Sequence, residues 1–161
     1  MAMTIKTDGL DRLGQILAQL ENEAGNVAAG ALYEGAGIAA NAFTAATNSI
    51  RTEPFWYAPE GKTRLASPEE KEALAGKVGI AKFDKNGAEV TTIIGISGKA
   101  GYEMVNGKKK PVLLIARSIN SGTSFMKKQP VYRKAKLTCE KAAQDAIVQK
   151  AEQMIEDITK G

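Results

Sequence analysis

The side chains that most enzymes use for acid–base and nucleophilic chemistry are missing or badly placed in this sequence. It has no histidine, so it lacks the commonest general base, the usual activator of a catalytic serine or cysteine, and the commonest zinc ligand. The single cysteine, Cys139, falls within a helical pattern, and we interpret it as a packed thiol rather than a nucleophile. The sequence therefore predicts no enzyme activity, no metal site and no cofactor.

Two other patterns have suitable residue types but the wrong spacing or setting. In the glycine-rich run 95–101, a phosphate-binding Walker loop would require glycine at Ile93 and serine or threonine at Ala100. Three carboxylates near the C-terminus have helical spacing, but nothing desolvates them, and we interpret them as a solvated face. They are Glu152, Glu156 and Asp157. An enzyme that uses only such carboxylates is the least favoured function.

Length and composition predict one globular domain over residues 1–161. Hydrophobic residues make up 43% of the chain and charged residues 25%, which is ordinary for a folded protein. The longest aliphatic run, 112–116, is far shorter than a membrane span. The first residues lack the pattern of a secretory signal, and a lone cysteine forms no internal disulfide, so we expect synthesis in a reducing cytoplasm.

Two long helices are expected, one towards each end of the chain. In the first, capped by Asp8, apolar residues recur at three- and four-residue spacing. They are Leu10, Leu13, Leu17, Leu20, Ala24, Val27 and Ala31. We expect a break near Gly35 or Gly37, because glycine weakens a helix. The second helix begins at Pro130. Its apolar face consists of Ala135, Cys139, Ala142, Ala143, Ala146, Ile147, Ala151, Met154, Ile155 and Ile158.

Residues 51–70 after the first helix contain three prolines and a glycine and predict an irregular loop. At its end, the sequence Ser-Pro-Glu-Glu predicts the start of a short helix that ends at Gly76. Two β-branched runs follow, Val78–Phe83 and Glu89–Ser97, and we expect them to form an antiparallel hairpin around the turn 84–87.

Residues Tyr102–Val105, which precede a second Asn-Gly pair, predict a third strand of this sheet. The run 111–122 suits a strand by its aliphatic residues and a short helix by its first proline and last glycine, and we favour the helix. The order of elements predicts an α+β fold. In it, a long N-terminal helix and a long C-terminal helix pack on a small antiparallel sheet.

Positive charge is concentrated in one part of the chain. Between Lys99 and Lys136 there are ten basic residues and one acid, Glu103, whereas the whole chain has a net charge of +4. Such asymmetry is typical of a surface that faces an acidic partner, either protein or nucleic acid, although it also serves solubility. The candidate partner-binding residues are Lys108, Lys109, Lys110, Lys127, Lys128 and Arg133.

Three aromatic residues stand side by side in the loop, and they are Phe55, Trp56 and Tyr57. Aromatic anchors are enriched at interface hot spots, but a loop can also fold such residues back onto its own core. Both interpretations remain open from the sequence, and the interface interpretation predicts that at least one of the three contacts a neighbouring subunit.

The segment before the C-terminal helix carries the most specific pattern of the chain. It consists of Gly122, Thr123, Ser124, Met126, Gln129, Pro130, Arg133 and Ala135. In order and spacing this run resembles the signature of the tail-completion, or head–tail joining, proteins of long-tailed double-stranded DNA bacteriophages. The Gly-Leu-Asp motif at Gly9 and the order of helix, β region, signature and helix resemble that family as well.

The resemblance implies a structural virion protein without catalysis. Such a protein acts as a hexameric ring at the head-proximal end of the tail, after synthesis in the bacterial cytoplasm. Its partners would be further copies of itself, the tail-tube or tail-terminator protein, and the head connector or adaptor protein. Genomic DNA would pass close by in the channel, and no membrane would be involved.

A small basic nucleic-acid-binding protein is the alternative function. In it, the lysines that follow Gly107 would contact phosphates from the tip of a hairpin. A single-strand binder is expected to interleave aromatic residues with its basic ones. The basic segment has only three aromatics, Tyr102, Phe125 and Tyr132, and this favours the joining function.

Overall fold

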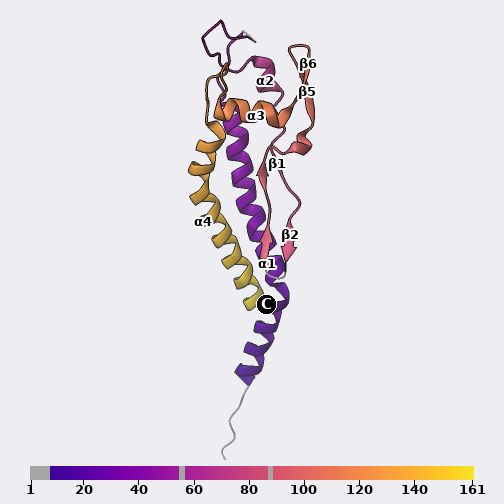
Figure 1. Cartoon of the computed structure of the whole chain (residues 1–161). Coiled ribbons are helices and arrows are strands. Elements are labelled where there is room, and N and C mark those ends of the chain that lie inside the picture. The colour runs from indigo at the N-terminus through magenta and orange to yellow at the C-terminus, as the bar shows by residue number, and fades with distance from the viewer. Residues whose placement is uncertain (1–7, 55–56, 87–88) are drawn as a thin grey trace, which may run out of the picture.

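The computed structural model describes residues 8–54, 57–86 and 89–161. Two long antiparallel helices, α1 (Asp8–Asn48) and α4 (Val131–Lys160), form a stalk. At one end of the stalk lies a head that contains the short helices α2 (Pro68–Glu72) and α3 (Val112–Ser121) and the hairpin of β5 and β6 (Figure 1). The predicted α+β fold with a long helix towards each end of the chain is confirmed.

Helix α1 is continuous, so the predicted break near Gly35 or Gly37 is wrong. The glycines serve helix packing instead. A Cβ atom on Gly35 would lie 2.5 Å from Cγ1 of Ile147, and one on Gly30 would lie 2.8 Å from Sδ of Met154. The missing side chains let α4 approach closely, and this packing offsets the low helix propensity of glycine.

Helix α4 begins at Val131, directly after the expected Pro130, and packs along α1. Near the head, the rings of Phe43 and Tyr132 stack with their centroids 5.8 Å apart, and the hydroxyls of Thr47 and Tyr132 are 2.8 Å apart. Of the two long helices, α1 makes the extended contacts with the strands. Along the stalk, the expected layer of two helices on one sheet is therefore a stack in which α1 lies between α4 and the strands of residues 79–95 (Figure 1).

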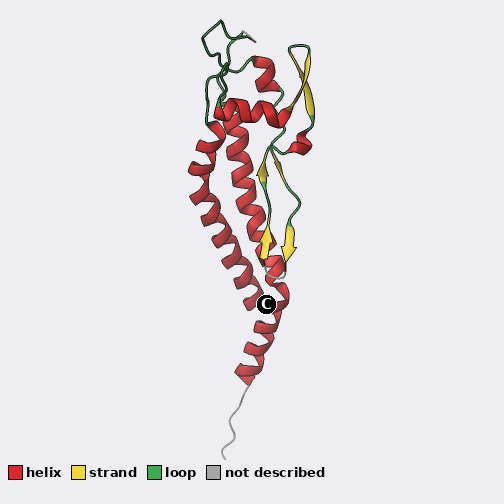
Figure 2. Cartoon of the chain, in the orientation of Figure 1, coloured by secondary structure: helices red, strands yellow, loops and turns green. Residues whose placement is uncertain are grey.

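Within the described residues, the strands form three separate two-stranded antiparallel ribbons (Figure 2). The ribbons are β1 (Gly79–Ile80) with β4 (Ile94–Gly95), β2 (Asp84–Asn86) with β3 (Glu89–Thr91), and β5 (Tyr102–Val105) with β6 (Lys108–Pro111). The first two lie along the predicted hairpin and confirm its antiparallel pairing. Its turn was predicted too early, because Asp84 to Asn86 are exposed and pair as a strand, with Asn86 opposite Glu89.

The prediction that Tyr102–Val105 adds a third strand to this hairpin is wrong. A 3-10 turn, η1 (Gly98–Ala100), and a positive φ of 79° at Gly101 redirect the chain, so among the described strands β5 pairs with β6 alone. The second Asn-Gly pair forms the connecting turn, as its type suggests, with φ values of 52° at Asn106 and 72° at Gly107.

The two short helices have the predicted starts. Ser67 caps α2 in a capping box with Glu70, and after Glu72 the chain continues as turns to Gly76, which has a φ of 68°. The ambiguous run 111–122 is helical, as favoured, and ends at Gly122 with a φ of 77°.

The main apolar core lies in the head rather than in the stalk. Its buried residues are Ile50, Ala66, Ala73, Leu74, Val105, Val112, Ile115, Ala116, Ile119 and Met126. They come from the loop after α1, from the turn that follows α2, from β5 and α3, and from the segment before α4. The described residues of the loop 51–70 are therefore part of the packed head.

Two alanine substitutions in α1 test the close approach of the stalk helices. Gly37→Ala should raise the free energy of unfolding by up to about 1 kcal/mol, because nothing lies within 4 Å of the new Cβ and alanine favours helix. Gly35→Ala should lower it by about 1–3 kcal/mol, because the new Cβ meets Ile147 and lies 3.1 Å from the carbonyl oxygen of Ala143. Urea denaturation measures both changes. A stabilising Gly35→Ala would contradict the packing.

Candidate functional site

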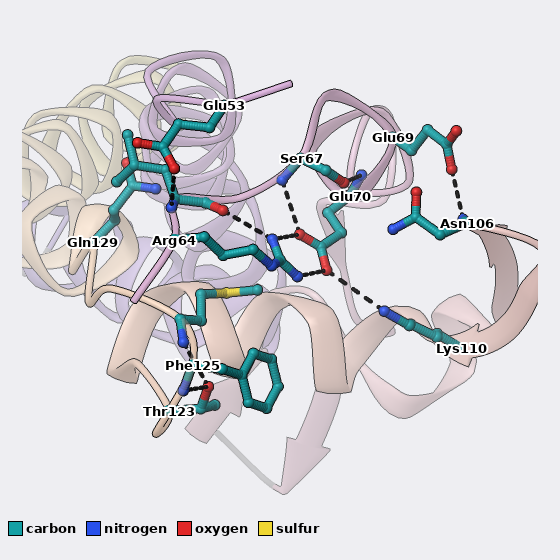
Figure 3. A network of polar contacts seen from close by, with 12 residues as sticks. Glu53, Arg64, Ser67, Glu69, Glu70, Asn106, Lys110, Thr123, Phe125 and Gln129 are labelled. Atoms are coloured by element: carbon teal, nitrogen blue, oxygen red, sulfur yellow. Dashed lines mark hydrogen bonds and ion pairs between the residues drawn. The ribbon is translucent and has the colours of Figure 1, made fainter. Parts of the chain in front are cut away.

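A buried ion pair lies within the head, between Arg64 of the loop and Glu70 of α2 (Figure 3). The guanidinium of Arg64 donates two hydrogen bonds to Glu70, one to each carboxylate oxygen and each 2.7 Å long. The whole residues are 4% and 2% exposed. Lys110, from β6, lies 3.6 Å from the same carboxylate. Two charges are thus held away from water in a bidentate geometry, with a third, half-exposed charge beside them.

Further hydrogen bonds reach this pair, although Nε of Arg64 is buried and has no hydrogen-bond partner among the described residues. The backbone N–H of Ser67 donates to Glu70 at 2.9 Å, and Arg64 also donates to the carbonyl oxygen of Leu65 at 2.8 Å. Burial alone would raise the pKa of Glu70. The hydrogen bonds from Arg64 and Ser67 and the charges of Arg64 and Lys110 outweigh it, so the pKa lies below its usual value. The carboxylate is therefore ionised at neutral pH.

The backbone of Arg64 connects the loop to the signature segment. Its N–H donates to the carbonyl oxygen of Phe125 at 2.9 Å, and its carbonyl oxygen accepts a 2.7 Å hydrogen bond from the N–H of Lys127. Arg64 and Met126 thereby form an isolated parallel bridge. The ring of Phe125 also lies 6.0 Å from the guanidinium carbon of Arg64. The ion pair and the signature are parts of one joint.

The first half of the signature builds a tight turn after α3. At Gly122 the positive φ admits the turn, and an added Cβ would lie 3.1 Å from Lys128. The hydroxyl of Thr123 accepts a 3.0 Å hydrogen bond from the N–H of Met126, whose side chain is in the core. Ser124 is exposed. Gly122, Thr123 and Met126 therefore fix the backbone geometry of this turn.

The second half of the signature attaches the start of α4 to the end of α1. The side chain of Gln129 is buried and bonds the backbone of Arg51 in both directions, accepting from its N–H at 3.0 Å and donating to its carbonyl oxygen at 2.9 Å. Pro130 precedes the first helical residue, and Ala135 is the residue of α4 with the deepest burial. Arg133 is exposed, and its N–H donates to Asn120 at 3.4 Å.

The six candidate basic residues lie on two segments, one before and one after α3. Lys108, Lys109 and Lys110 follow one another along β6, so they alternate between the two faces of the ribbon. Lys110 is engaged with Glu70, whereas the ammonium of Lys109 lies 5.2 Å from the ring centroid of the exposed Tyr102. Lys108 is exposed.

The second segment presents Lys127 and Lys128 beside the turn of the signature. Both are exposed, and they line an open hollow of about 480 Å³ together with Thr63 and Thr123. The structure thus brings these two lysines together near Arg133, at the start of α4, and separates them from the β6 lysines by the length of α3.

The aromatic loop is described only in part. Phe55 and Trp56 lie outside the described residues. Tyr57 is 55% exposed and lines a hollow of about 370 Å³ with Glu53, Lys62 and Arg64. The interface interpretation of the three aromatics stays a prediction.

A further hollow of about 240 Å³ lies where α1, β4, α3 and α4 meet. Phe43, Ile94 and Tyr132 line it with other apolar residues, and the exposed Arg117 lines it as well. Burial raises the pKa of Tyr132, although the hydrogen bond with Thr47 opposes this. Such a hollow can accept an apolar side chain that lies next to an acidic group.

Sequence reasoning missed Arg64 and this hollow. The capping motif at Ser67 predicted that Glu70 lies in the first turn of a helix. No local pattern predicted its ion pair with Arg64, because that ion pair depends on how the loop folds. The hollow is assembled from four elements that are distant in the sequence, and only the structure reveals it.

In comparisons with protein families, with characterised proteins and with solved structures, no match to this chain was found. Among the described residues, no group of histidine, cysteine and carboxylate side chains is arranged to hold a metal ion. None of the described helices is both long and apolar enough to cross a bilayer.

The ion pair predicts how stability depends on pH. Because the pKa of Glu70 is lower in the folded chain, its contribution is complete above about pH 4.5 and disappears as the pH falls through the folded-state value. Glu70→Gln should lower the free energy of unfolding by about 3–5 kcal/mol at pH 7, because it leaves Arg64 buried and unpaired. Denaturation at a series of pH values measures both effects.

The exposed Glu72→Gln in the same helix is the matched control and should change stability little. The loss of stability between wild type and Glu70→Gln should shrink below pH 4.5, since the wild-type carboxylate is then being protonated as well. A difference that stays constant down to pH 2 would contradict the ionised pair.

Proposed function

We propose that this chain is a structural virion protein of a tailed bacteriophage. It completes the head-proximal end of the tail and joins it to the head connector, as a hexameric ring. Its partners are further copies of itself, the tail-tube or tail-terminator protein, and the connector or adaptor protein. It carries out no catalysis.

One observation supports this proposal above the others. Four of the eight residues through which the chain resembles the joining proteins shape the joint between α3 and α4, namely Gly122, Thr123, Met126 and Gln129. Met126 and Gln129 are buried, and Gly122 has a backbone conformation that suits glycine. Such residues maintain the backbone conformation of the joint. A fixed conformation is what a protein needs when it docks to its partners and catalyses no reaction.

The joint between α3 and α4 also positions two exposed lysines. Lys127 and Lys128 stand between the buried Met126 and Gln129, and the N–H of Lys127 is bonded to Arg64. Their backbone is thereby anchored on both sides, so the positions from which these two exposed side chains extend are fixed. Binding of an acidic protein face to these lysines therefore costs less backbone entropy than binding to lysines on a loose loop would cost.

Charge reversal at one lysine on each side of α3 tests the proposal. Lys109→Glu combined with Lys128→Glu should leave genome packaging intact, while filled heads and finished tails accumulate unjoined and infectious particles are lost. Lys110 is left unchanged because it faces Glu70. Electron microscopy of lysates of the phage that encodes this chain, with a count of plaques, measures the outcome.

The matched control is Lys85→Glu with Lys141→Glu, which changes the net charge equally at two exposed positions outside the head. It should leave joining unchanged. Normal infectious particles from the head variant would contradict the proposal. Empty heads, together with salt-sensitive DNA binding that the head variant loses, would favour the nucleic-acid-binding alternative.

A further inference from the structure

The hollow of about 240 Å³ lies at the head end of the stalk, where α3 crosses α1 and the start of α4 (Figure 1). One wall is the stacked pair of Phe43 and Tyr132, and the hydrogen bond between the hydroxyls of Thr47 and Tyr132 holds the second ring in place. The rest of the apolar lining consists of Ile94, Ile96, Leu113 and Ala116. We refer to this site as the apolar hollow.

Gly95, at the end of β4, keeps one side of the apolar hollow open. Its φ of 141° suits glycine, and a Cβ atom there would lie 3.9 Å from Cε1 of Phe43. A side chain at this position would lie against the aromatic wall and occupy part of the hollow. Glycine at residue 95 therefore preserves the depth of the hollow.

The polar lining of the apolar hollow lies mainly along α3. Arg117 and Ser121 are exposed, and Asn120 accepts the N–H of Arg133 through its side-chain oxygen. Within the part of the chain that the structure describes, the guanidinium of Arg117 forms no salt bridge. A ligand in the hollow therefore meets apolar side chains on one side and a cation on the other.

The apolar hollow adjoins a basic one. Ser121 lines both this hollow and the open hollow of about 480 Å³ that Lys127 and Lys128 line. Among the residues that the structure describes, no acidic side chain lines either hollow. The one acid of the basic segment, Glu103, is engaged elsewhere, because its carboxylate lies 2.7 Å from Nζ of Lys77. The two hollows together therefore favour a ligand that is apolar at one end and acidic along the rest.

We propose that the apolar hollow binds one large apolar side chain from an acidic segment of a partner protein. The apolar side chain lies against Phe43 and Tyr132, and a carboxylate beside it meets Arg117. Further carboxylates of the segment meet Lys127 and Lys128. This inference rests on the proposed function, because it names the chemistry through which a tail or connector protein binds at these lysines.

The size and lining of the hollow favour this ligand over others. Pockets for drug-sized ligands usually measure about 300–1,000 Å³, whereas an apolar cavity of about 150 Å³ accepts a benzene ring. At about 240 Å³ the hollow suits one aromatic or long aliphatic side chain. A nucleobase would leave its edge donors and acceptors unpaired against Ile94, Ile96 and Leu113. A lone terminal carboxylate would leave the two lysines unused.

Short peptides test the site on the full-length chain. The probe is acetyl-Phe-Asp-Glu-Asp-Glu-amide, with versions in which tryptophan, leucine or methionine replaces phenylalanine. At least one should bind at low salt with a Kd below about 1 mM. The alanine version should bind about tenfold or more weakly, because it lacks the side chain that the hollow buries. Isothermal titration calorimetry measures the constants. Four anchored peptides that bind no more tightly than the alanine version would overturn the proposal.

Methyl NMR spectra locate the bound peptide. The signals of Ile94, Ile96 and Leu113 should shift when the peptide is added. The matched control is Leu17, which is 57% exposed on α1 and does not line the hollow, so its signals should stay in place. Unchanged signals at Ile94 and Leu113 would overturn the proposal. So would shifts there that grow with protein concentration alone, because a second copy of the chain would then be the occupant.

Arg117→Glu tests the cation beside the apolar hollow. It should weaken peptide binding by about fivefold or more, because a carboxylate would then face the carboxylates of the peptide. The matched control is Lys85→Glu, which changes the net charge equally at an exposed position of β2 outside both hollows and should leave the Kd unchanged. Circular dichroism checks that both variants keep the wild-type helix content. Equal binding by wild type and Arg117→Glu would overturn the proposal.

Two further comparisons separate this inference from the other functions. A single-stranded oligothymidylate with the charge of the peptide should leave the methyl signals of Ile94 in place, and an oligonucleotide that shifts them and displaces the peptide would overturn the proposal. Peptides that fail to bind, while Lys109→Glu with Lys128→Glu still prevents joining, would overturn this inference and leave the proposed function intact. Peptide binding at the hollow alongside normal joining in that variant would support the site and contradict the proposed function.

Discussion

The buried contact between Arg64 and Glu70 is the constraint on which the head depends. A guanidinium and a carboxylate leave water together only when their geometry and remaining hydrogen bonds compensate the loss of hydration. Here the capping backbone of Ser67, the carbonyl of Leu65 and the ammonium of Lys110 provide those bonds and charges. Because the partners come from the loop, α2 and β6, the pair determines how three segments lie relative to one another.

The stalk depends on the head in turn. Its helices approach closely at Gly30 and Gly35, which gives a good fit but little apolar area, since glycine contributes no side chain. Polar contacts at the head end hold the helices in register, namely Thr47 with Tyr132 and Gln129 with Arg51. The large apolar core lies in the head, so the stalk helices are anchored mainly at their head end.

The elements that the sequence predicted well are those with local signals. The leucine stripe, the capping motif at Ser67 and the second Asn-Gly pair each specify a conformation within a few residues, and the structure has all three. The predicted break at Gly35 was wrong because the reason for that glycine lies on another helix. The separation of β5 from the first hairpin, and the pairing of Arg64, likewise depend on contacts between distant segments. The basic residues could be identified from composition, but their division between two segments could not.

The basic residues at the start of α4 are unfavourable for the helix itself. Arg133, Lys134 and Lys136 stand at the positive end of the helix dipole, where cations are unfavourable by about 0.3–1 kcal/mol each. No acidic residue occupies the first turn and no side chain caps it. The helix start is held instead by backbone bonds, such as that from the N–H of Gln129 to the carbonyl oxygen of Ile119. Helix stability therefore does not account for these cations, whereas an acidic surface docked at this end of the molecule would stabilise them.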